Sequence, residues 1–402
     1  MANSVAILSQ FFYPETAAVA QLLTELAVDL SQNGIDTVAY TAQPSYHRRS
    51  RLPRKQVYRS VKIYRLFSTQ FSKDRLSGRL LNGLTFSTAV LARLLFSRRR
   101  QALLVTTNPP FLLWVAWLVW LLRRREYILL VHDIYPDVAI RLGYMGDRDL
   151  IARVWRWFNR KAYGRASAII VLGEQMRRVI ERSAAQLPPV HVIHSWADGS
   201  HVRPLPKRLN PFVKRHALEG KLVVLYSGNL GQAHELETLV EAAERLKGLH
   251  ELVILFIGEG AKKAKLMAMV EERQLSNVLF LPPVPYEELS YSLTAGDIGV
   301  VTLEGGVEGL CEPSKLYGYL AAGLAILALV GEKSEVAEIV ERHQCGYRLD
   351  QGDVDGVVEI LRYLATHRGE LEKMKRSARE CLEHFYDRRL AVEKYLDIIR
   401  NL

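Results

Sequence analysis

The feature that most constrains the fold is an alternation of short apolar segments with amphipathic ones, and it runs through the chain twice. In the first half, apolar segments such as SVAILSQF are closed by turn or cap residues, and a segment with helical spacing ends at Gly34. The pattern restarts at KLVVLYSGNLG, which leads into HELETLVEAAERLKG. Strands separated by helices indicate doubly wound parallel sheets. We therefore expect an α/β protein with two Rossmann-like doubly wound parallel-sheet domains and a cleft between them.

The length of the chain supports this division, because 402 residues exceed one typical core and suit two domains of about 200 residues each. The region between the halves contains Pro204, Pro206 and Pro211 among basic residues, which is typical of a linker. The final segment, DRRLAVEKYLDIIRNL, has the spacing of a long amphipathic helix. The expected organisation is a first domain over 1–200, a linker over 201–220, a second domain over 221–380, and a helix over 381–402 that closes back toward the first domain.

Charge is divided unevenly between the two halves. Residues 1–200 carry 28 Lys and Arg against 13 Asp and Glu, whereas residues 201–402 carry 26 against 30. A basic half beside a mildly acidic half indicates that an anionic surface or a polyanion meets the first domain. A basic surface that only confers solubility is the alternative. Nucleic-acid binding is disfavoured, because the arginines are scattered and no recognised binding module is present.

The longest apolar run, FLLWVAWLVWLL at residues 111–122, is too short to cross a membrane, since a spanning helix needs roughly 20 apolar residues. Residues 80–100 and 111–125, with the basic run at 47–55, could instead hold the first domain at an anionic membrane surface. The alternative is that both apolar stretches are core helices. The N-terminus has no signal-peptide pattern and the three cysteines have no metal or disulfide spacing. We expect a cytoplasmic protein, peripheral at the inner face of the plasma membrane.

Two loops of the second half are candidates for ligand binding, because ligands of open α/β sheets bind at the carboxyl ends of strands. Ser227–Gly231 (SGNLG) places glycines where backbone N–H groups can approach an anion at a helix start. Glu312–Leu316 (EPSKL) opens a helix, so free N–H groups, the positive end of the helix dipole and the Lys315 ammonium converge. This convergence predicts a diphosphate site made without a metal. A capped helix with a solvated lysine is the alternative.

Two loops of the first half are further candidates. His132 and Asp133 directly follow the strand YILLV, where an imidazole can hydrogen-bond a sugar hydroxyl or a reacting group. Between the first strand and the first helix, the segment FFYPET is followed by Ala17 and Ala18, whose small side chains allow a ligand near the helix N-terminus. Each of these patterns, taken singly, also fits a structural role.

Several other functions lose support because their motifs are absent. No P-loop pattern is present, and no Gly-x-Gly-x-x-Gly follows the first strand, which disfavours nucleotide hydrolysis and dinucleotide-dependent oxidoreduction. No Asp-x-Asp marks a metal-dependent sugar transferase, and no His/Cys cluster marks a zinc site. We therefore expect neither a metal nor another cofactor.

Taken together and in order, these segments resemble glycosyltransferase family 4, and most of all its WbuB-like bacterial enzymes of O-antigen, capsule and exopolysaccharide synthesis. The matching stretches are spread over nearly the whole chain: ILSQFFYPETAAVAQLLTELAVDL, VTTNPPF, VHDIYPDVAIRLG, VIHSWAD, LYSGNLGQAHELETLVEAA, NVLFLPPVPYEEL and PSKLYGYLAAG. The resemblance implies a GT-B fold and retention of the anomeric configuration. It also implies a nucleoside-diphosphate-sugar donor, usually UDP-linked, held mainly by the second domain, and a polyprenyl-diphosphate-linked saccharide acceptor held by the first.

The resemblance also implies roles for individual residues. His132 would lie near the donor sugar, and Lys315 would stabilise charge on the leaving diphosphate. Pro282–Pro285 would flank the base. The implied donor-binding residues are Gly228, Asn229, Gly231, His234, Pro283, Val284, Glu312, Pro313, Ser314 and Leu316, and the implied acceptor-binding residues are Tyr13, Glu15, Thr16, Ala17 and Asp133.

The chain departs from the wider family at two places. Asn229 and His234 stand where an Arg and a Lys are usual, and Leu310 and Gly318 stand where a pair of glutamates is usual. The ribose contact and the donor-facing carboxylate therefore do not carry over directly, although Glu312 or Glu308 could substitute. Two other functions remain open: a non-hydrolysing sugar-nucleotide epimerase, which needs cleft carboxylates as acid and base, and a non-catalytic binding protein of the same fold.

Overall fold

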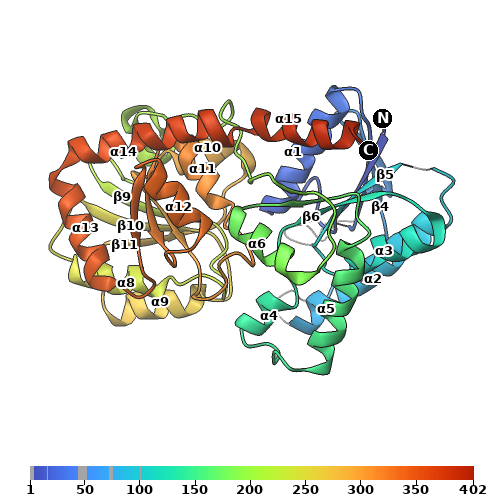
Figure 1. Cartoon of the computed structure of the whole chain (residues 1–402). Coiled ribbons are helices and arrows are strands. Elements are labelled where there is room, and N and C mark those ends of the chain that lie inside the picture. The colour runs from blue at the N-terminus through green and yellow to red at the C-terminus, as the bar shows by residue number, and fades with distance from the viewer. Residues whose placement is uncertain (1–3, 16, 44–51, 72–75, 100) are drawn as a thin grey trace. The chain divides into compact units, whose positions relative to one another are not determined.

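The computed structural model describes residues 4–15, 17–43, 52–71, 76–99 and 101–402. Thr16 and most of the basic run at 47–55 lie outside the described residues. The chain forms two compact units (Figure 1). Unit 1 comprises Met1–His194, Gly309–Glu312 and Leu390–Leu402, and unit 2 comprises Ser195–Glu308 and Pro313–Arg389.

Unit 1 is built on an eight-stranded sheet in the order β3-β4-β2-β1-β5-β6-β7-β8. The central strands are buried residue after residue, as parallel strands covered by helices on both faces must be. The predicted parallel sheet is confirmed, but the edge strand β3 was not expected and pairs antiparallel with β4. The strands are β1 (Ser4–Leu8), β2 (Asp36–Thr41), β3 (Lys55–Tyr58), β4 (Val61–Arg65), β5 (Ala102–Thr106), β6 (Tyr127–Val131), β7 (Ala168–Val171) and β8 (Val190–Val192).

The helices of unit 1 include three that pack beside one another: α3 contacts both α2 and α5 (Figure 1). α3 is the apolar run of the sequence, and it buries one face, including Leu113 and Ala116, while Leu121 and Leu122 stay exposed. No helix of the described residues is both long enough and apolar enough to span a bilayer. The helices are α1 (Ala18–Gln32), α2 (Leu76–Leu95), α3 (Leu112–Arg123), α4 (Asp137–Arg141), α5 (Leu150–Tyr163), α6 (Glu174–Ser183) and α15 (Arg388–Arg400), whose last residues belong to this unit.

Unit 2 is built on a six-stranded sheet in the order β11-β10-β9-β12-β13-β14, with every neighbouring pair parallel. Alternate residues of β9, among them Leu222 and Val224, share one buried cluster with α8 and α13. The strands are β9 (Leu222–Ser227), β10 (Leu252–Ile257), β11 (Val278–Leu281), β12 (Ile298–Thr302), β13 (Ala325–Leu329) and β14 (Gly346–Leu349). The α-helices are α7 (Pro211–Arg215), α8 (Glu237–Arg245), α9 (Lys263–Glu272), α10 (Leu289–Leu293), α11 (Lys315–Ala322), α12 (Glu335–Arg342), α13 (Val354–Thr366) and α14 (Arg368–Cys381).

Residues 201–220, expected as a linker, lie inside unit 2. Their proline and basic content is typical of a loop, but Phe212 and Val213 are buried and anchor the segment. The buried side chain of Asn210 accepts from the Phe212 backbone N–H at 2.9 Å and donates to the Tyr291 carbonyl at 2.9 Å. These contacts turn a proline-rich segment into part of the packed unit, so the division between the units falls earlier, at His194 and Ser195.

The segment 381–402, expected as a helix, contains a π-helical turn followed by the helix α15. α14 ends at Cys381, a π-helical turn covers Leu382–Tyr386, and α15 follows. The last residues return to unit 1, where the Arg400 guanidinium donates to the Asn33 carbonyl at 3.3 Å.

Candidate functional site

The strongest candidate site lies in unit 2, at the carboxyl ends of β9 and β12. These two strands are neighbours in the sheet, and the strand order runs in opposite directions on either side of them. Such a reversal point is where open α/β sheets bind ligands, because the loops that follow the two strands diverge there. The loop after β9 carries Gly228, Asn229, Gly231 and His234, so four of the ten predicted donor-binding residues lie at this point.

The glycines of this region let the loops after β9 and β10 pack backbone against backbone. Gly258 has a φ of +152°, and a Cβ built on it would lie 1.9 Å from the Gly228 carbonyl oxygen. The Gly228 N–H donates to the Ile257 carbonyl at 2.9 Å, and the Leu230 N–H donates to Glu259 at 2.9 Å. The glycines of SGNLG and of GEG at residues 258–260 are therefore explained by the close approach of the two loop backbones. This approach leaves little side-chain bulk near the strand ends.

Lys315 is the first residue of α11, and its ammonium is held against Tyr226 of β9. The Lys315 Nζ donates to the Tyr226 hydroxyl at 2.8 Å and lies 4.3 Å from the centre of the same ring. The hydroxyl in turn donates to the Asn229 carbonyl at 2.8 Å. Burial raises the pKa of Tyr226 well above its ordinary value, so the phenol stays neutral and can serve as this bridge. A Cβ on Gly228 would lie 3.4 Å from the Lys315 Cε, so the structure brings Gly228, Asn229 and Lys315 together.

A second tyrosine, Tyr319 of α11, supports the same loop. The Tyr319 hydroxyl accepts from the Ser227 backbone N–H at 2.7 Å, at the last residue of β9. The side chain is fully buried, so this contact fixes the distance between α11 and the strand end. No pattern in the sequence pointed to Tyr226 or Tyr319, because an aromatic residue in a strand or helix usually belongs only to the core.

His234 joins the loop after β9 to the end of β12. Its Nδ1 lies 2.9 Å from the Thr302 carbonyl oxygen. Burial lowers the pKa of His234, the neighbouring Lys315 and Lys262 lower it further, and together they outweigh the Thr302 hydrogen bond to leave it at about 3. The imidazole is therefore neutral at physiological pH.

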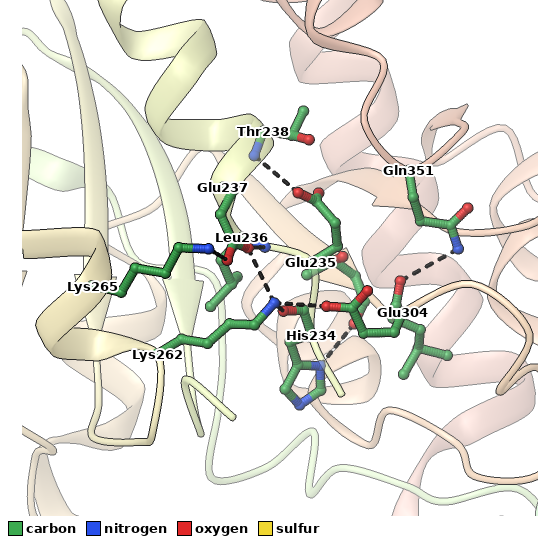
Figure 2. A network of polar contacts seen from close by, with 11 residues as sticks. His234, Glu235, Leu236, Glu237, Thr238, Lys262, Lys265, Glu304 and Gln351 are labelled. Atoms are coloured by element: carbon green, nitrogen blue, oxygen red, sulfur yellow. Dashed lines mark hydrogen bonds and ion pairs between the residues drawn. The ribbon is translucent and has the colours of Figure 1, made fainter. Parts of the chain in front are cut away.

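A buried ion-pair network lies directly behind His234 (Figure 2). The Lys262 Nζ donates to the His234 carbonyl at 2.7 Å, to Glu304 at 2.6 Å and to Glu237 at 3.1 Å. Burial alone would lower the pKa of Lys262, but the two carboxylates outweigh it and raise the pKa. Lys265 reaches Glu237 from the outside at 2.8 Å. The network ties the loop after β9, the turn before α9 and the end of β12 into one block, and no motif in the sequence revealed it.

The remaining predicted donor residues have mixed placements. Pro283 and Val284 lie in the loop after β11, and Ser314 immediately precedes α11. Leu316 is only 1 % exposed, because this position of α11 faces the core. Pro313 is also buried. Glu312 groups with unit 1, whereas the helix it precedes belongs to unit 2.

In unit 1, His132 and Asp133 follow β6, as predicted, and one hydroxyl positions both. The Thr107 Oγ1 accepts from the His132 backbone N–H at 2.9 Å and from the Asp133 N–H at 3.1 Å. Burial lowers the pKa of His132 to about 4 and raises the pKa of Asp133 to about 6. Asp133 also forms an isolated antiparallel bridge with Cys311, and the neighbouring Ile134 N–H donates to Leu310 at 2.8 Å. A neutral imidazole and a carboxylate of raised pKa suit contacts with sugar hydroxyls and proton transfer.

The predicted acceptor loop after β1 is anchored at Tyr13. Its ring stacks on Tyr58 of β3 with centroids 3.8 Å apart, and its carbonyl accepts from the buried Arg65 guanidinium at 3.0 Å. Glu15 is mostly buried, and Ala17 precedes α1 in an extended conformation. The placement of this loop at the same sheet edge as His132 follows from the order of β1, β5 and β6.

The three packed helices of unit 1 present exposed apolar side chains together with cations. α2, α3 and α5 contain seven Lys and Arg residues and no Asp or Glu. Arg124 and Arg165 lie 4.7 and 4.9 Å from the ring centre of Trp120. The exposed apolar residues of this three-helix face are Leu81 and Leu84 of α2, Leu121 and Leu122 of α3, and Leu150, Ile151, Val154 and Trp157 of α5. The contribution of α5 was missed, because its basic residues mask the amphipathic spacing.

No group of three or more His, Cys, Asp or Glu side chains among the described residues is arranged to hold a metal ion.

Two family descriptions match this chain, one in each half. Residues 18–196 match the glycosyl transferase 4-like domain, and residues 210–381 match the glycosyl transferases group 1. A probable glycosyltransferase from Pseudomonas aeruginosa, WbjE, is 26 % identical over 335 residues, which cover 82 % of each chain. The putative colanic acid biosynthesis glycosyl transferase WcaI from Escherichia coli is 29 % identical over 184 residues, covering 46 % of this chain and 44 % of WcaI.

Solved structures share the fold of the whole chain at low sequence identity. Sucrose-phosphate synthase from Thermosynechococcus elongatus has a TM-score of 0.78 at 14 % identity, with 99 % of this chain and 98 % of that one covered. HepE from Anabaena, in complex with UDP, has a TM-score of 0.72 at 13 % identity and is covered completely by 99 % of this chain. The expected GT-B fold of two parallel-sheet α/β domains is confirmed.

Proposed function

This chain belongs to glycosyltransferase family 4 and is a glycosyltransferase of bacterial polysaccharide biosynthesis, and we propose that it moves a sugar from a UDP-linked donor, with retention of configuration, to a polyprenyl-diphosphate-linked saccharide. The observation that carries the proposal is the site at the ends of β9 and β12, where Lys315, bare glycine backbone and a helix start converge. Unit 2 holds the donor in this proposal, and unit 1 holds the acceptor.

The donor class is proposed from the charge of the site and from one neighbour. A nucleoside diphosphate needs a positive charge, and the Lys315 ammonium together with the positive end of the α11 dipole supplies it without a metal. HepE, whose fold this chain shares, has been solved with UDP. We propose UDP for the same reason that the sequence suggested it, which is the resemblance of SGNLG and PSKLYGYLAAG to the family.

The proposed chemistry is front-face transfer without an enzymic nucleophile. The acceptor hydroxyl oxygen bonds to the anomeric carbon, the bond from that carbon to the diphosphate breaks, and the leaving phosphate takes the hydroxyl proton. Lys315 and the dipole of α11 stabilise the charge that develops on the diphosphate. His132, neutral at physiological pH, forms a hydrogen bond with a sugar hydroxyl as donor or acceptor. Asp133 orients the hydroxyl of the acceptor saccharide.

The proposed acceptor is lipid-linked, so the enzyme must work at a membrane surface. The three-helix face of unit 1 supports this part of the proposal, since its helices combine exposed apolar side chains with seven Lys and Arg residues and no Asp or Glu of their own. One of these cations, Arg156 of α5, is paired with Asp137 and Asp147. Each cation near an anionic leaflet contributes about 1 kcal/mol, and exposed Trp and Leu side chains add apolar burial. We propose that this face, with α5 included, lies on the inner leaflet of the plasma membrane.

The decisive experiment follows radioactive sugar from UDP-linked donors into a lipid extract. Purified enzyme is incubated with membranes and each of several UDP-[14C]sugars, with GDP- and ADP-sugars as alternatives. Transfer of label to the lipid phase from a UDP-sugar supports the proposal, and transfer only from another nucleotide sugar overturns the UDP assignment. Epimerised nucleotide sugar in the aqueous phase, with no lipid label, would instead identify an epimerase.

A further inference from the structure

We propose that His234 binds a hydroxyl group of the nucleotide-sugar donor through an unprotonated Nε2, and does not bind the diphosphate. This inference rests on the proposed function, since it concerns how the same site recognises its nucleotide-sugar donor. It departs from the expectation that His234, standing where the family usually has a cation, contacts phosphate.

The tautomer of His234 follows from its partner. A backbone carbonyl can only accept a hydrogen bond, so the proton in the contact between Nδ1 and the Thr302 oxygen, 2.9 Å apart, belongs to Nδ1. In a neutral imidazole the other nitrogen then carries no hydrogen and offers a lone pair. Nε2 of His234 is therefore an acceptor.

The surroundings of the ring keep it neutral. Two cations face it, Lys315 from α11 and Lys262 from the turn before α9, and Tyr226 of β9 is a neutral phenol. The carboxylates of Glu304 after β12 and Glu237 at the start of α8 are bonded by Lys262. The carboxylate of Glu235, next to His234 in the loop, accepts from the Thr238 backbone N–H at 3.0 Å. Protonation of Nε2 would place a third positive charge beside Lys315 and Lys262 on a mostly buried ring, so Nε2 stays unprotonated.

The ring is also held in place, which a recognition group requires. Lys262 donates to the His234 carbonyl at 2.7 Å, and the Glu304 N–H donates to the neighbouring Ala233 carbonyl at 2.9 Å. In Figure 2 the ring points away from this network, with Nδ1 turned back toward Thr302. Lys262 is thus a positioning residue, because it fixes the backbone from which the imidazole projects.

This arrangement divides the donor between two neighbouring groups. The diphosphate of a nucleotide sugar is esterified at both ends, so its oxygens carry no hydrogen at neutral pH. An unprotonated Nε2 therefore repels them, while Lys315 attracts them. Ribose and hexose hydroxyls can donate to Nε2. Gly318 of α11 stands where a glutamate is usual in the family, and it has no side chain to make such a contact. His234 supplies an acceptor from the loop after β9 instead.

The test measures binding of UDP by titration calorimetry at neutral pH in two buffers of different ionisation enthalpy. We expect the observed binding enthalpy to be the same in both buffers, and hence no proton uptake. UDP, 2′-deoxy-UDP and 3′-deoxy-UDP form one set of ligands, and UDP-glucose with its four monodeoxy-glucose analogues forms the other. The analogue that lacks the contacted hydroxyl should bind the wild type about tenfold more weakly than its parent ligand, which is the size of one neutral hydrogen bond. His234→Ala should bind this analogue and the parent ligand equally.

The two ligand sets distinguish the two sources of the hydroxyl, because discrimination in the first set identifies the ribose and in the second the sugar. His234→Gln, which retains an amide acceptor, should recover part of the discrimination, and Gln232→Ala on the same loop is the matched control, since its side chain is exposed. Lys262→Gln should lower the discrimination while leaving the absence of proton uptake unchanged.

Uptake of about one proton per UDP in the wild type, absent in His234→Ala, would overturn the inference and identify His234 as a cationic phosphate ligand. Equal discrimination by the wild type and His234→Ala in both sets, with both proteins folded by thermal denaturation, would also overturn it. A wild type that binds a GDP- or ADP-sugar but not UDP contradicts the proposed donor and the inference together, whereas the first two outcomes leave the proposed function intact.

Discussion

The ammonium of Lys315 lies 2.8 Å from the hydroxyl of Tyr226 and 4.3 Å from the centre of its ring, so one side chain of β9 holds the first residue of α11 by both its polar and its aromatic parts. Because the same hydroxyl donates to the Asn229 carbonyl, the position of the cation is coupled to the loop after β9. A lysine side chain fixed in this way loses little conformational entropy when its ammonium binds a diphosphate.

We expect Lys315→Ala to reduce sugar transfer by about two orders of magnitude or more, since it removes the charge that stabilises the leaving diphosphate. The measurement is initial-rate transfer under saturating donor, with Lys333→Ala, an exposed lysine of the same unit, as the control. Tyr226→Phe should lower the rate by roughly tenfold, because the ammonium loses its hydrogen-bond partner. Wild-type rates in Lys315→Ala would exclude this lysine from the mechanism.

Gly258→Ala should destabilise unit 2 by about 3 kcal/mol, because a Cβ there meets the Gly228 carbonyl and the backbone has a φ of +152°. Gly248→Ala is the matched control, since nothing lies within 4 Å of its Cβ position. Urea denaturation followed by tyrosine and tryptophan fluorescence measures the difference. Equal midpoints for the two variants would show that the loops after β9 and β10 can separate at little cost.

Lys262→Met should cost about 2 kcal/mol of stability, because it removes the cation that the partly buried carboxylates of Glu237 and Glu304 share and leaves Glu237 with the exposed Lys265. The neighbouring Lys263→Met is the control, since its partner Glu259 is largely exposed and such pairs contribute about 0.5 kcal/mol. Chemical denaturation at neutral pH gives both values. If Lys262→Met were as mild as Lys263→Met, the network would not hold the loop of His234.

Asp133→Asn should stabilise the protein at high pH while lowering activity. The folded pKa of Asp133, about 6, lies above the ordinary value of 3.8, so this carboxyl makes the free energy of unfolding fall as the pH rises from about 4 to about 6, and the loss stays constant above that. At pH 8 the neutral amide should therefore raise the free energy of unfolding by about 2 kcal/mol. Near pH 4 the carboxyl is protonated in the folded state, and the advantage should largely disappear.

Thermal denaturation of wild type and Asp133→Asn at the two pH values tests this dependence, with Asp36→Asn as a control because that residue is exposed and its partner is the exposed Lys62. The same pH-independent shift at both values would argue against a desolvated carboxyl. A large activity loss in Asp133→Asn, alongside greater stability at pH 8, is the expected signature of a site residue.

Substitution of both Leu150 and Ile151 of α5 by Glu should weaken binding to vesicles containing anionic lipid at least tenfold. Each of these side chains is more than half exposed, so the change removes apolar contact with lipid and adds repulsion without disturbing the core. Flotation with vesicles at low and high salt measures it. Leu209→Glu, an exposed leucine of unit 2, should bind like the wild type.

Vesicle binding by the α5 variant that matches the wild type would leave the three-helix face without a membrane role. Binding that is insensitive to salt and to lipid charge would contradict the electrostatic part alone.

The sequence by itself determined the fold class and the loops that matter. Alternating strands and helices can bury their apolar faces only in parallel sheets, and parallel sheets collect their ligand loops at one edge, so Gly228, Asn229 and Lys315 could be named from order and spacing. His234 could be named only from the family resemblance. The sequence also located the apolar run of α3. These features are local, since each depends on periodicity or on residues adjacent in the chain.

Only the tertiary structure decided which side chains meet. Leu316 was expected at the ligand and lies in the core, because the rotation of α11 about its axis is set by packing and not by its motif. Tyr226 reaches Lys315 across 89 residues, and Lys262 reaches Glu304 across 42. The tautomer of His234 likewise depends on the Thr302 carbonyl, 68 residues away. Such contacts have no signature along the chain, because the residue types that make them serve equally well as ordinary core aromatics and surface charges.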